Sequence, residues 1–165
     1  MHAADFTIYR VTLVRDGAVQ LRHPMAGRTI HHSRDAAEVV AAYLQDAAEE
    51  RFVVLWMDRK NHLIGMRTVA VGTLSEAAVH PREVFTGVCD GRVASIVLAH
   101  NHLGMDSQPS QPDRVTTHRL VQVGHLLGVP VLDHVIVAFR LDGSLTHYSF
   151  ADEGCLSAEP WKEKQ

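Results

Sequence analysis

Three short apolar runs constrain the fold of this chain more than any other feature of its sequence. They are FVVLWM at 52–57, VASIVLA at 93–99 and VLDHVIVAF at 131–139. The first run is bounded by charged residues and contains none, and the second is similarly apolar, so both are predicted to be strands buried on both faces of a sheet. Such strands need other elements packed on each side of the sheet.

Helical patterns alternate with these runs. Apolar residues at spacings of three and four predict a helix with Ser33 as its N-cap, ending near residues 49–50. Pro81 and Glu83 stand where the first turn of a helix favours them, which predicts a short helix to about Val88.

A third helix is predicted between the second and third apolar runs, and Gly128 and Pro130 end it. The apolar residues expected to line this helix are Val115, Val121, Leu126 and Leu127.

Further extended segments complete the predicted sheet. Residues 63–73 and 145–150 are predicted strands, and the segments 6–14 and 18–22 flank RDG in the pattern of a β-hairpin. The sequence therefore predicts one α/β domain, a mixed β-sheet flanked by helices with an N-terminal β-hairpin. The expected divisions are a hairpin extension at 1–33, the main domain at 34–155 and a C-terminal tail at 156–165.

Composition excludes several classes of protein. Lys and Arg number 16 against 19 Asp and Glu, and the charges are scattered, which argues against tight, nonspecific nucleic-acid binding. Cys89 and Cys155 lie far apart without a CxxC motif, so neither a disulfide framework nor a thiolate zinc site is expected, and a reducing cytoplasm fits best. The N-terminus lacks the apolar stretch of a signal peptide, and no apolar run reaches the roughly 18 residues of a membrane span.

The second apolar run leads directly into His100 and His102. Alternate residues of a strand point to the same face, so the two imidazoles are expected about 6 to 7 Å apart along the backbone, a spacing that suits one divalent ion such as zinc. Asn101 points the other way. Ser110 is a natural N-cap for the third helix, whose first turn would carry Asp113 back to the histidines as a third ligand.

Simpler interpretations exist for each part of this pattern. S-x-x-D before a helix is an ordinary variant of the capping box, and an isolated H-x-H is more often a pair of strand-end histidines. The combination in order is far more specific, because it requires a strand end, a loop and a helix start. An HNH nuclease is not indicated, since its motif residues are dispersed rather than contiguous, and the H-x-E and P-C-x-x-C residues of zinc deaminases are absent.

His100, His102, Ser110 and Asp113 reproduce H-x-H-x7-S-x2-D, and the chain thereby resembles the JAMM or MPN+ metalloproteases, also called JAB domains. More narrowly, HNH, Asp106, HPREVF and LLGVPVLDHVIV look like bacterial RadC-family proteins, over about 36–154. The resemblance implies a mixed sheet flanked by helices, of cytidine-deaminase-like architecture. It also implies one Zn2+ held by the two histidines and the aspartate, with a water in the fourth position.

The chain departs from the family pattern in two places. Leu103, Gly104 and Met105 stand where the family has Pro-Ser-Gly, which changes the loop lining the cleft and its substrate preference. No counterpart of the helix-hairpin-helix region of full-length RadC proteins is found in this sequence, so any DNA association carried by that region cannot be transferred to it.

The family resemblance also assigns a carboxylate. AEERFVVLWMD is similar to the family's REVFLVLFLD and places Glu50 at the general-base position, where chemistry needs a group that takes a proton from water and passes it to the departing amine. Without the resemblance, Glu50 would be interpreted as a solvated charge. Glu83 is the competing carboxylate, although it already has a role at a helix terminus.

Two other residues have alternative roles. The resemblance implies that Ser110 donates a hydrogen bond to the oxyanion of the tetrahedral intermediate, in addition to or instead of capping its helix. Asp133 and His134 look like part of the family's LLDHLI; His134 is interpreted first as a satisfied core histidine and second as support for the metal ligands.

These features together predict a zinc-dependent metallopeptidase or isopeptidase, in which Glu50 activates a zinc-bound water to hydrolyse a peptide or isopeptide bond. The substrate is expected to be a peptide or protein whose identity the sequence leaves open, together with the oligomeric state. The alternative is a noncatalytic MPN-type binding module associated with DNA repair or mobile-element functions.

Overall fold

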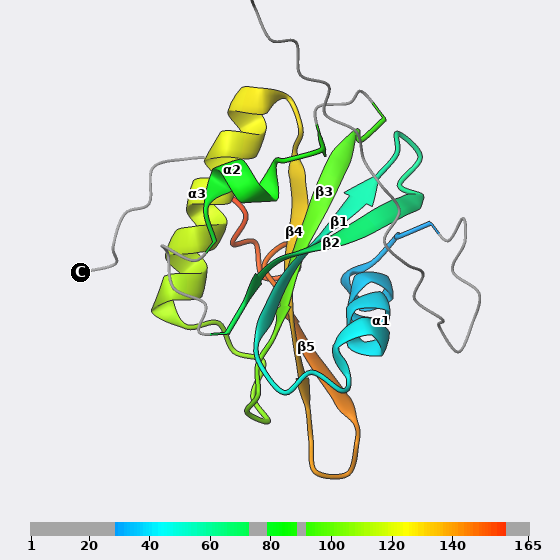
Figure 1. The fold of residues 1–165 in the computed structure, drawn as a ribbon, viewed down its shortest axis with the longest axis vertical. Coiled ribbons are helices and arrows are strands. Elements are labelled where there is room, and N and C mark those ends of the chain that lie inside the picture. The colour runs from blue at the N-terminus through cyan, green and yellow to red at the C-terminus, as the bar shows by residue number, and fades with distance from the viewer. Residues whose placement is uncertain (1–28, 73–78, 89–91, 158–165) are drawn as a thin grey trace, which may run out of the picture.

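The computed structural model describes residues 29–72, 79–88 and 92–157, which form one five-stranded sheet with helices on both sides (Figure 1). The strands are β1 (Arg51–Met57), β2 (Leu63–Val71), β3 (Ser95–Asn101), β4 (Val131–Phe139) and β5 (Leu145–Ser149). The helices are α1 (Ser33–Leu44), α2 (Pro81–Val84) and α3 (Gln111–Leu127).

Strand pairing makes the sheet mixed. The strand order is β2-β1-β3-β4-β5, in which β3 and β4 run parallel and the other neighbours run antiparallel. Helix α3 connects the parallel pair, because a tight turn can join only antiparallel strands. The prediction of an α/β domain with a mixed sheet flanked by helices is confirmed.

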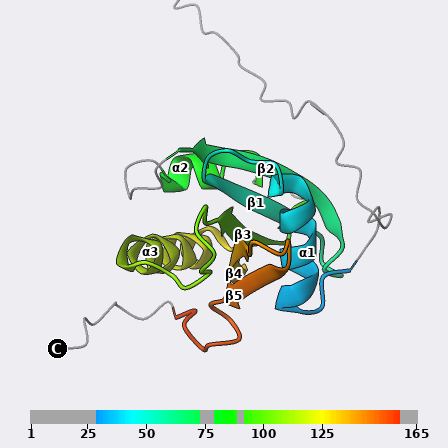
Figure 2. The ribbon, with the colours of Figure 1, turned by 90° about the horizontal axis from the view of Figure 1, so that it is seen from below.

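Different helices cover the two faces of the sheet (Figure 2). On one face, Val40 and Leu44 of α1 share a core cluster with Leu55 of β1. On the other face, Leu98 of β3 and Leu120 of α3 share a second cluster, to which α2 also contributes. Every residue of β3 is buried, as its uninterrupted apolar run predicts for a strand covered on both sides.

The start of α1 differs from its prediction by one residue. Ser33, the predicted N-cap, is the first helical residue, and His32 is the N-cap. The Asp35 carboxylate accepts hydrogen bonds from the backbone N–H groups of His31 and His32, at 2.9 and 3.1 Å. The Ser33 hydroxyl instead donates to Asp152 at 2.6 Å, so a tertiary contact uses the group that the sequence assigned to capping.

The predicted end of α1 near residue 50 is wrong, because the helix stops at Leu44. The backbone beyond it bonds to the sheet rather than to the helix. The carbonyl of Glu50 accepts a hydrogen bond from the Gly72 N–H at 2.8 Å, and the carbonyl of Glu49 accepts one from the Asn101 side chain at 3.3 Å.

The other helices begin where the sequence predicts. Helix α2 ends at Val84 rather than near 88, since Gly87 adopts a left-handed conformation with φ of 82° that a helix cannot continue. Helix α3 follows its N-cap Ser110 and ends at Gly128, whose φ is 69°.

The predicted lining of α3 is wrong at its C-terminal end. Leu126 and Leu127 are 82% and 48% exposed. The helix instead turns Thr117, Leu120 and Gly124 inward. A Cβ atom on Gly124 would lie 2.6 Å from the carbonyl oxygen of Val129, so the absence of a side chain lets the helix pack closely there.

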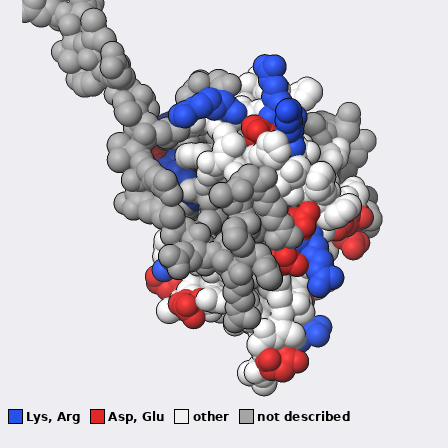
Figure 3. Space-filling model, turned by 90° about the vertical axis from the view of Figure 1, so that its right-hand side faces the viewer, with Lys and Arg blue, Asp and Glu red and all other residues white. Residues whose placement is uncertain are grey.

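Some sequence predictions lie outside the described residues, notably the N-terminal hairpin at 6–22 and most of the tail at 156–165. Among the described residues, no helix is long and apolar enough to cross a membrane. On the face in Figure 3, the described basic side chains lie near acidic ones rather than forming a continuous basic surface.

Asp133 generates the first prediction. Its buried carboxylate accepts hydrogen bonds from the backbone N–H groups of His134 and Ala151 at 2.7 and 2.9 Å and from the Ser149 hydroxyl at 2.6 Å. Burial raises the pKa of this carboxyl despite those three bonds. Asp133→Ala is expected to lower the free energy of unfolding by about 2 to 4 kcal/mol in urea denaturation, because three donors lose their acceptor.

Asp133→Asn is the matched control. It keeps one oxygen for the two backbone donors, and its amide can donate to Ser149, so a loss of less than about half that of Asp133→Ala is expected. Equal stability of the alanine variant and the wild type would contradict the structural role of Asp133.

Candidate metal centre

Three side chains converge where β3 ends and α3 begins. His100 is the penultimate residue of β3, His102 follows that strand, and Asp113 lies in the first turn of α3. The Nε2 atoms of the two histidines are 3.1 Å apart, and the Asp113 carboxylate oxygens lie 3.3 Å from that of His100 and 3.5 Å from that of His102. The structure therefore brings together the three residues that the sequence proposed as ligands, and this group could hold a metal ion.

A chain of hydrogen bonds fixes the tautomer of His100. The Thr117 hydroxyl donates to the carbonyl of Asp113 at 2.6 Å, so its oxygen accepts from Nδ1 of His134 at 2.5 Å. Nε2 of His134 then accepts from Nδ1 of His100 at 2.9 Å. With its hydrogen on Nδ1, the neutral His100 imidazole presents the lone pair of Nε2 to Asp113 and His102.

His102 is oriented by a backbone carbonyl. Its Nδ1 lies 3.0 Å from the oxygen of Asp106, which can only accept, so Nδ1 carries a hydrogen and neutral His102 also presents a lone pair at Nε2. Two lone pairs and a carboxylate facing one another repel unless a cation lies between them. The arrangement therefore fits a metal ion, with an outer hydrogen bond on each imidazole of the kind that orients histidine ligands.

Burial and neighbouring charges shift the pKa values of the three residues in different directions. Burial lowers the pKa of His100 to about 4, outweighing the attraction of Asp113. For Asp113 burial raises the pKa, but a hydrogen bond from His102, the electrostatic interaction with His100 and hydrogen bonds from Ser110 outweigh it and lower the pKa overall. The Asp113 hydrogen bond raises the pKa of His102, so a proton competes with a metal ion at this residue and metal binding is expected to release it.

Aromatic rings pack against His134, the histidine that lies behind His100. Phe150 stacks on His134 with ring centroids 5.1 Å apart, and Phe52 lies 5.3 Å from His134 and 5.9 Å from His100. His134 is fully buried, as the core interpretation predicts, and it also contacts His100. No pattern in the sequence indicates Thr117, whose part in the hydrogen-bond chain is evident only in three dimensions.

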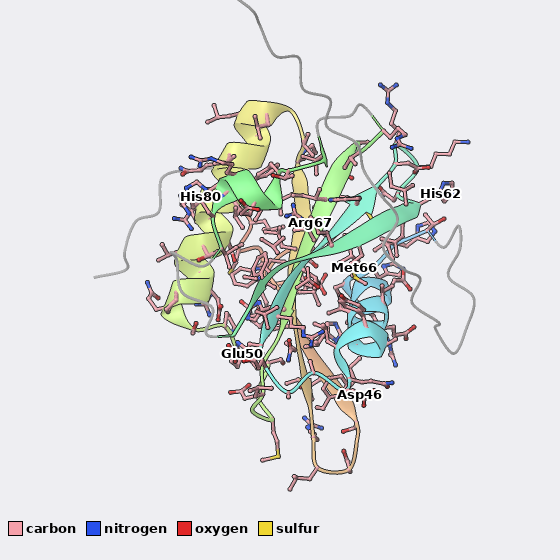
Figure 4. The ribbon with its side chains drawn as sticks, viewed as in Figure 1. Asp46, Glu50, His62, Met66, Arg67 and His80 are labelled. Carbon is pink, nitrogen blue, oxygen red and sulfur yellow. The ribbon has the colours of Figure 1, made fainter. Side chains whose placement is uncertain are left out.

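Glu50 shares a cavity with this group. The cavity has a volume of about 350 Å3 and is lined by Glu50, His102, Gly104, Asp106, Ser110 and Asp113. Figure 4 shows Glu50 at the end of the sheet where β1 begins, which is also the end with the loop after β3. Glu83 lies elsewhere, with its carboxylate 3.3 Å from the guanidinium of Arg67, a residue that Figure 4 places toward the middle of the sheet.

Ser110 caps α3 as predicted. Its Oγ accepts from the backbone N–H of Asp113 at 3.3 Å and donates to the Asp113 carboxylate at 2.5 Å. The single hydroxyl hydrogen is thus used on Asp113, and an oxyanion contact requires the hydroxyl to rotate. Leu103 and Met105 in the neighbouring loop are 60% and 56% exposed, so the departure from the family pattern leaves apolar side chains beside the cavity.

Comparison with known proteins agrees with this geometry. Residues 30–155 match the RadC-like JAB domain. The chain belongs to the RadC-like JAB domain family. It is 39% identical over 119 residues to a UPF0758 protein of Shouchella clausii and 40% identical over 117 residues to one of Moorella thermoacetica.

A UPF0758 protein of Methanosarcina mazei is 35% identical over 127 residues. These three alignments cover 72%, 71% and 77% of this JAB domain chain and 52%, 50% and 53% of the respective relatives. The chain thus spans about half the length of the curated relatives it matches.

The geometry predicts that His102→Ala and Asp113→Ala each weaken binding of Zn2+ or Co2+ by more than about a hundredfold, because each removes a direct ligand and loss of an outer contact alone costs 10- to 100-fold. Titration with Co2+ followed by visible absorption, and elemental analysis of purified protein, measure this. His125→Ala, which changes an exposed histidine on α3, is the control and should bind one ion as the wild type does. Undiminished metal content in both ligand variants would exclude this site.

Proposed function

We propose that this domain is a zinc-dependent metallopeptidase or isopeptidase. The observation that carries the proposal is a carboxylate, Glu50, in the same cavity as His102 and Asp113 but outside the group that could bind the metal. A site that only holds a metal for structural reasons has no need of a further carboxylate facing an open cavity.

The donor set supports zinc as the metal. Two imidazole nitrogens and one carboxylate, from His100, His102 and Asp113, are the ligand types of catalytic zinc sites, which keep a position open. When bound, zinc supplies a water of pKa near 7 and polarises a carbonyl oxygen.

The residues of the chain then have distinct roles. The Glu50 carboxylate takes a proton from the attacking water as the bond from water oxygen to carbonyl carbon forms, and it passes this proton to the amine nitrogen as the carbon–nitrogen bond breaks. The Ser110 hydroxyl rotates from Asp113 toward the developing oxyanion and donates a hydrogen bond to it. His134 and Thr117 keep His100 in the tautomer that leaves Nε2 free.

The substrate in this proposal is a peptide or protein, and the relatives leave its identity open because their UPF0758 names state no activity. The proposal includes a cytoplasmic location, because the two widely separated cysteines indicate no disulfide framework, and the division of the chain at 1–33, 34–155 and 156–165. A search of a diverse peptide library for bonds cleaved by the wild type but not by Glu50→Gln would define the substrate class.

Glu50 is expected to be the general base. Glu50→Gln keeps the size of the side chain but cannot accept a proton, so peptide hydrolysis should fall by about two to four orders of magnitude while zinc content stays at the wild-type level. The matched control is Glu83→Gln, which loses an exposed ion pair with Arg67 and should change the rate little.

Two results would overturn this assignment. Equal hydrolysis by wild type and Glu50→Gln on a confirmed substrate would remove Glu50 from the mechanism. No hydrolysis by zinc-loaded wild type on any peptide of a broad library would favour the noncatalytic binding module instead.

Ser110→Ala separates capping from catalysis. Loss of the cap is expected to cost about 1 kcal/mol of stability, and loss of the oxyanion contact to slow turnover by on the order of a hundredfold, with the metal retained. Ser110→Thr keeps a hydroxyl at the same position and serves as the control. A lowered melting temperature with normal turnover in Ser110→Ala would leave the serine with only its capping role.

A further inference from the structure

The middle residue of the HNH tripeptide points away from the metal centre and toward the base. We infer that Asn101 is a positioning residue that fixes the backbone carrying Glu50; the inference rests on the proposed role of Glu50 and names what holds it in place. Asn101 would thereby determine where the Glu50 carboxylate stands relative to His100 and His102.

The contacts of Asn101 flank Glu50 on both sides. The side-chain oxygen of Asn101 accepts the backbone N–H of Arg51 at 2.8 Å, and its side-chain nitrogen donates to the carbonyl of Glu49 at 3.3 Å. Asn101 is only 2% exposed, so these are bonds of a buried amide that water does not replace. Glu50 itself is held from the other side, where its carbonyl accepts the N–H of Gly72 at 2.8 Å.

The segment before β1 has little else to order it. Helix α1 ends at Leu44, and residues 45–50 belong to no helix or strand. Glu49 is exposed and Glu50 is half-buried, so neither is fixed by burial in the core. Besides the Asn101 bonds, the described backbone contacts of residues 49–51 are the bond between Glu50 and Gly72 and the pairing of Arg51 with Val71, both on the β2 side.

The hydrogen bonds of Asn101 lie just beyond the end of the β1–β3 ladder. The pairing of β1 with β3 reaches Phe52 opposite His100 and goes no further. One residue beyond, the Asn101 amide supplies an acceptor and a donor to the β1 side, in place of the backbone groups that a longer ladder would offer. Asn has both groups in one short side chain, which explains why this residue type suits the position.

Strand alternation makes this arrangement specific. Side chains of successive strand residues point to opposite faces, so His100 is directed to the metal centre and Asn101 to the Glu50 segment. Three consecutive residues therefore contact both the candidate metal centre and the segment that carries the base.

The first experiment uses metal-free protein and needs no substrate. In Asn101→Ala, amide hydrogen exchange at Arg51 should accelerate by on the order of tenfold, and 15N order parameters at residues 49–51 should fall. Asn101→Asp keeps the acceptor, so the Arg51 amide should stay protected while Glu49 gains mobility. Tyr43→Phe removes one side-chain hydrogen bond, to Thr68, and should leave residues 49–51 unchanged.

The second experiment separates positioning from general support of the fold. Co2+ should bind Asn101→Ala as tightly as the wild type, because the ligands are intact. On a peptide that the wild type cleaves, Asn101→Ala should lower kcat by about ten- to a hundredfold with little change in KM, and the same substitution in a Glu50→Gln background should lower it no further.

The outcomes are distinct. Unchanged exchange at Arg51 and unchanged order at 49–51 in Asn101→Ala would overturn the inference, as would a full further loss of rate in the Glu50→Gln background. If Asn101→Ala does not fold, exposure of the Arg51 amide in Asn101→Asp overturns it equally. If the exchange results hold but no peptide is cleaved, the hydrolase proposal fails and the role of Asn101 in placing Glu50 stands.

Discussion

The hydrogen bond between His100 and His134 is the interaction on which the rest of the site depends. It joins two fully buried imidazoles on the parallel strands β3 and β4, at 2.9 Å. Burial, followed by the neighbouring His100, lowers the pKa of His134 well below its usual value, and burial also lowers that of His100, so both rings stay neutral. A neutral pair must bond in one direction only, and Thr117 sets that direction at the far end of the chain. The core of the sheet thus determines which nitrogen faces the cavity.

This dependence explains the composition of α3. A helix that only covered a sheet would turn an apolar stripe inward, and the sequence prediction of Leu126 and Leu127 as lining assumed such a stripe. The buried residues of the helix are instead Asp113, Thr116, Thr117, Leu120 and Gly124, of which three are polar. Asp113 and Thr117 among them contribute to the candidate metal centre, and hydrophobic periodicity cannot detect buried polar residues of this kind.

The residues of the site differ in how far the sequence alone could predict their positions. Strand alternation and helix capping are local rules, so His100, His102, Ser110 and Asp113 could be placed from spacing alone. Glu50 needed the family resemblance, because the only local pattern near it suggested a helix end, and the predicted helix was six residues too long. The bonds of Asn101 to Arg51 and of His134 to His100 could not be predicted, since each joins residues more than 30 positions apart in the chain. Local sequence rules fail where the hydrogen-bond partner of a side chain is a backbone group or a ring far away in the sequence.

The antiparallel pairing of β1 with β3 gives the two ends of β1 very different tolerance to changes in chain length. Glu50 precedes the amino end of β1, whereas the turn at 58–62 leaves its carboxyl end, on the side of the sheet remote from the metal centre. Lengthening that turn at its exposed residues costs the hydrogen bonds that Asp58 makes to Lys60 and His62, but it adds no residue to β1. Adding one residue between Glu50 and Phe52 shifts the residues before it by one position. Because strand side chains alternate between faces, the Glu50 carboxylate would then point away from the cavity. Peptide tags and inserted domains therefore belong in the exposed middle of this turn, at 59–60, where the added chain lies far from the cavity.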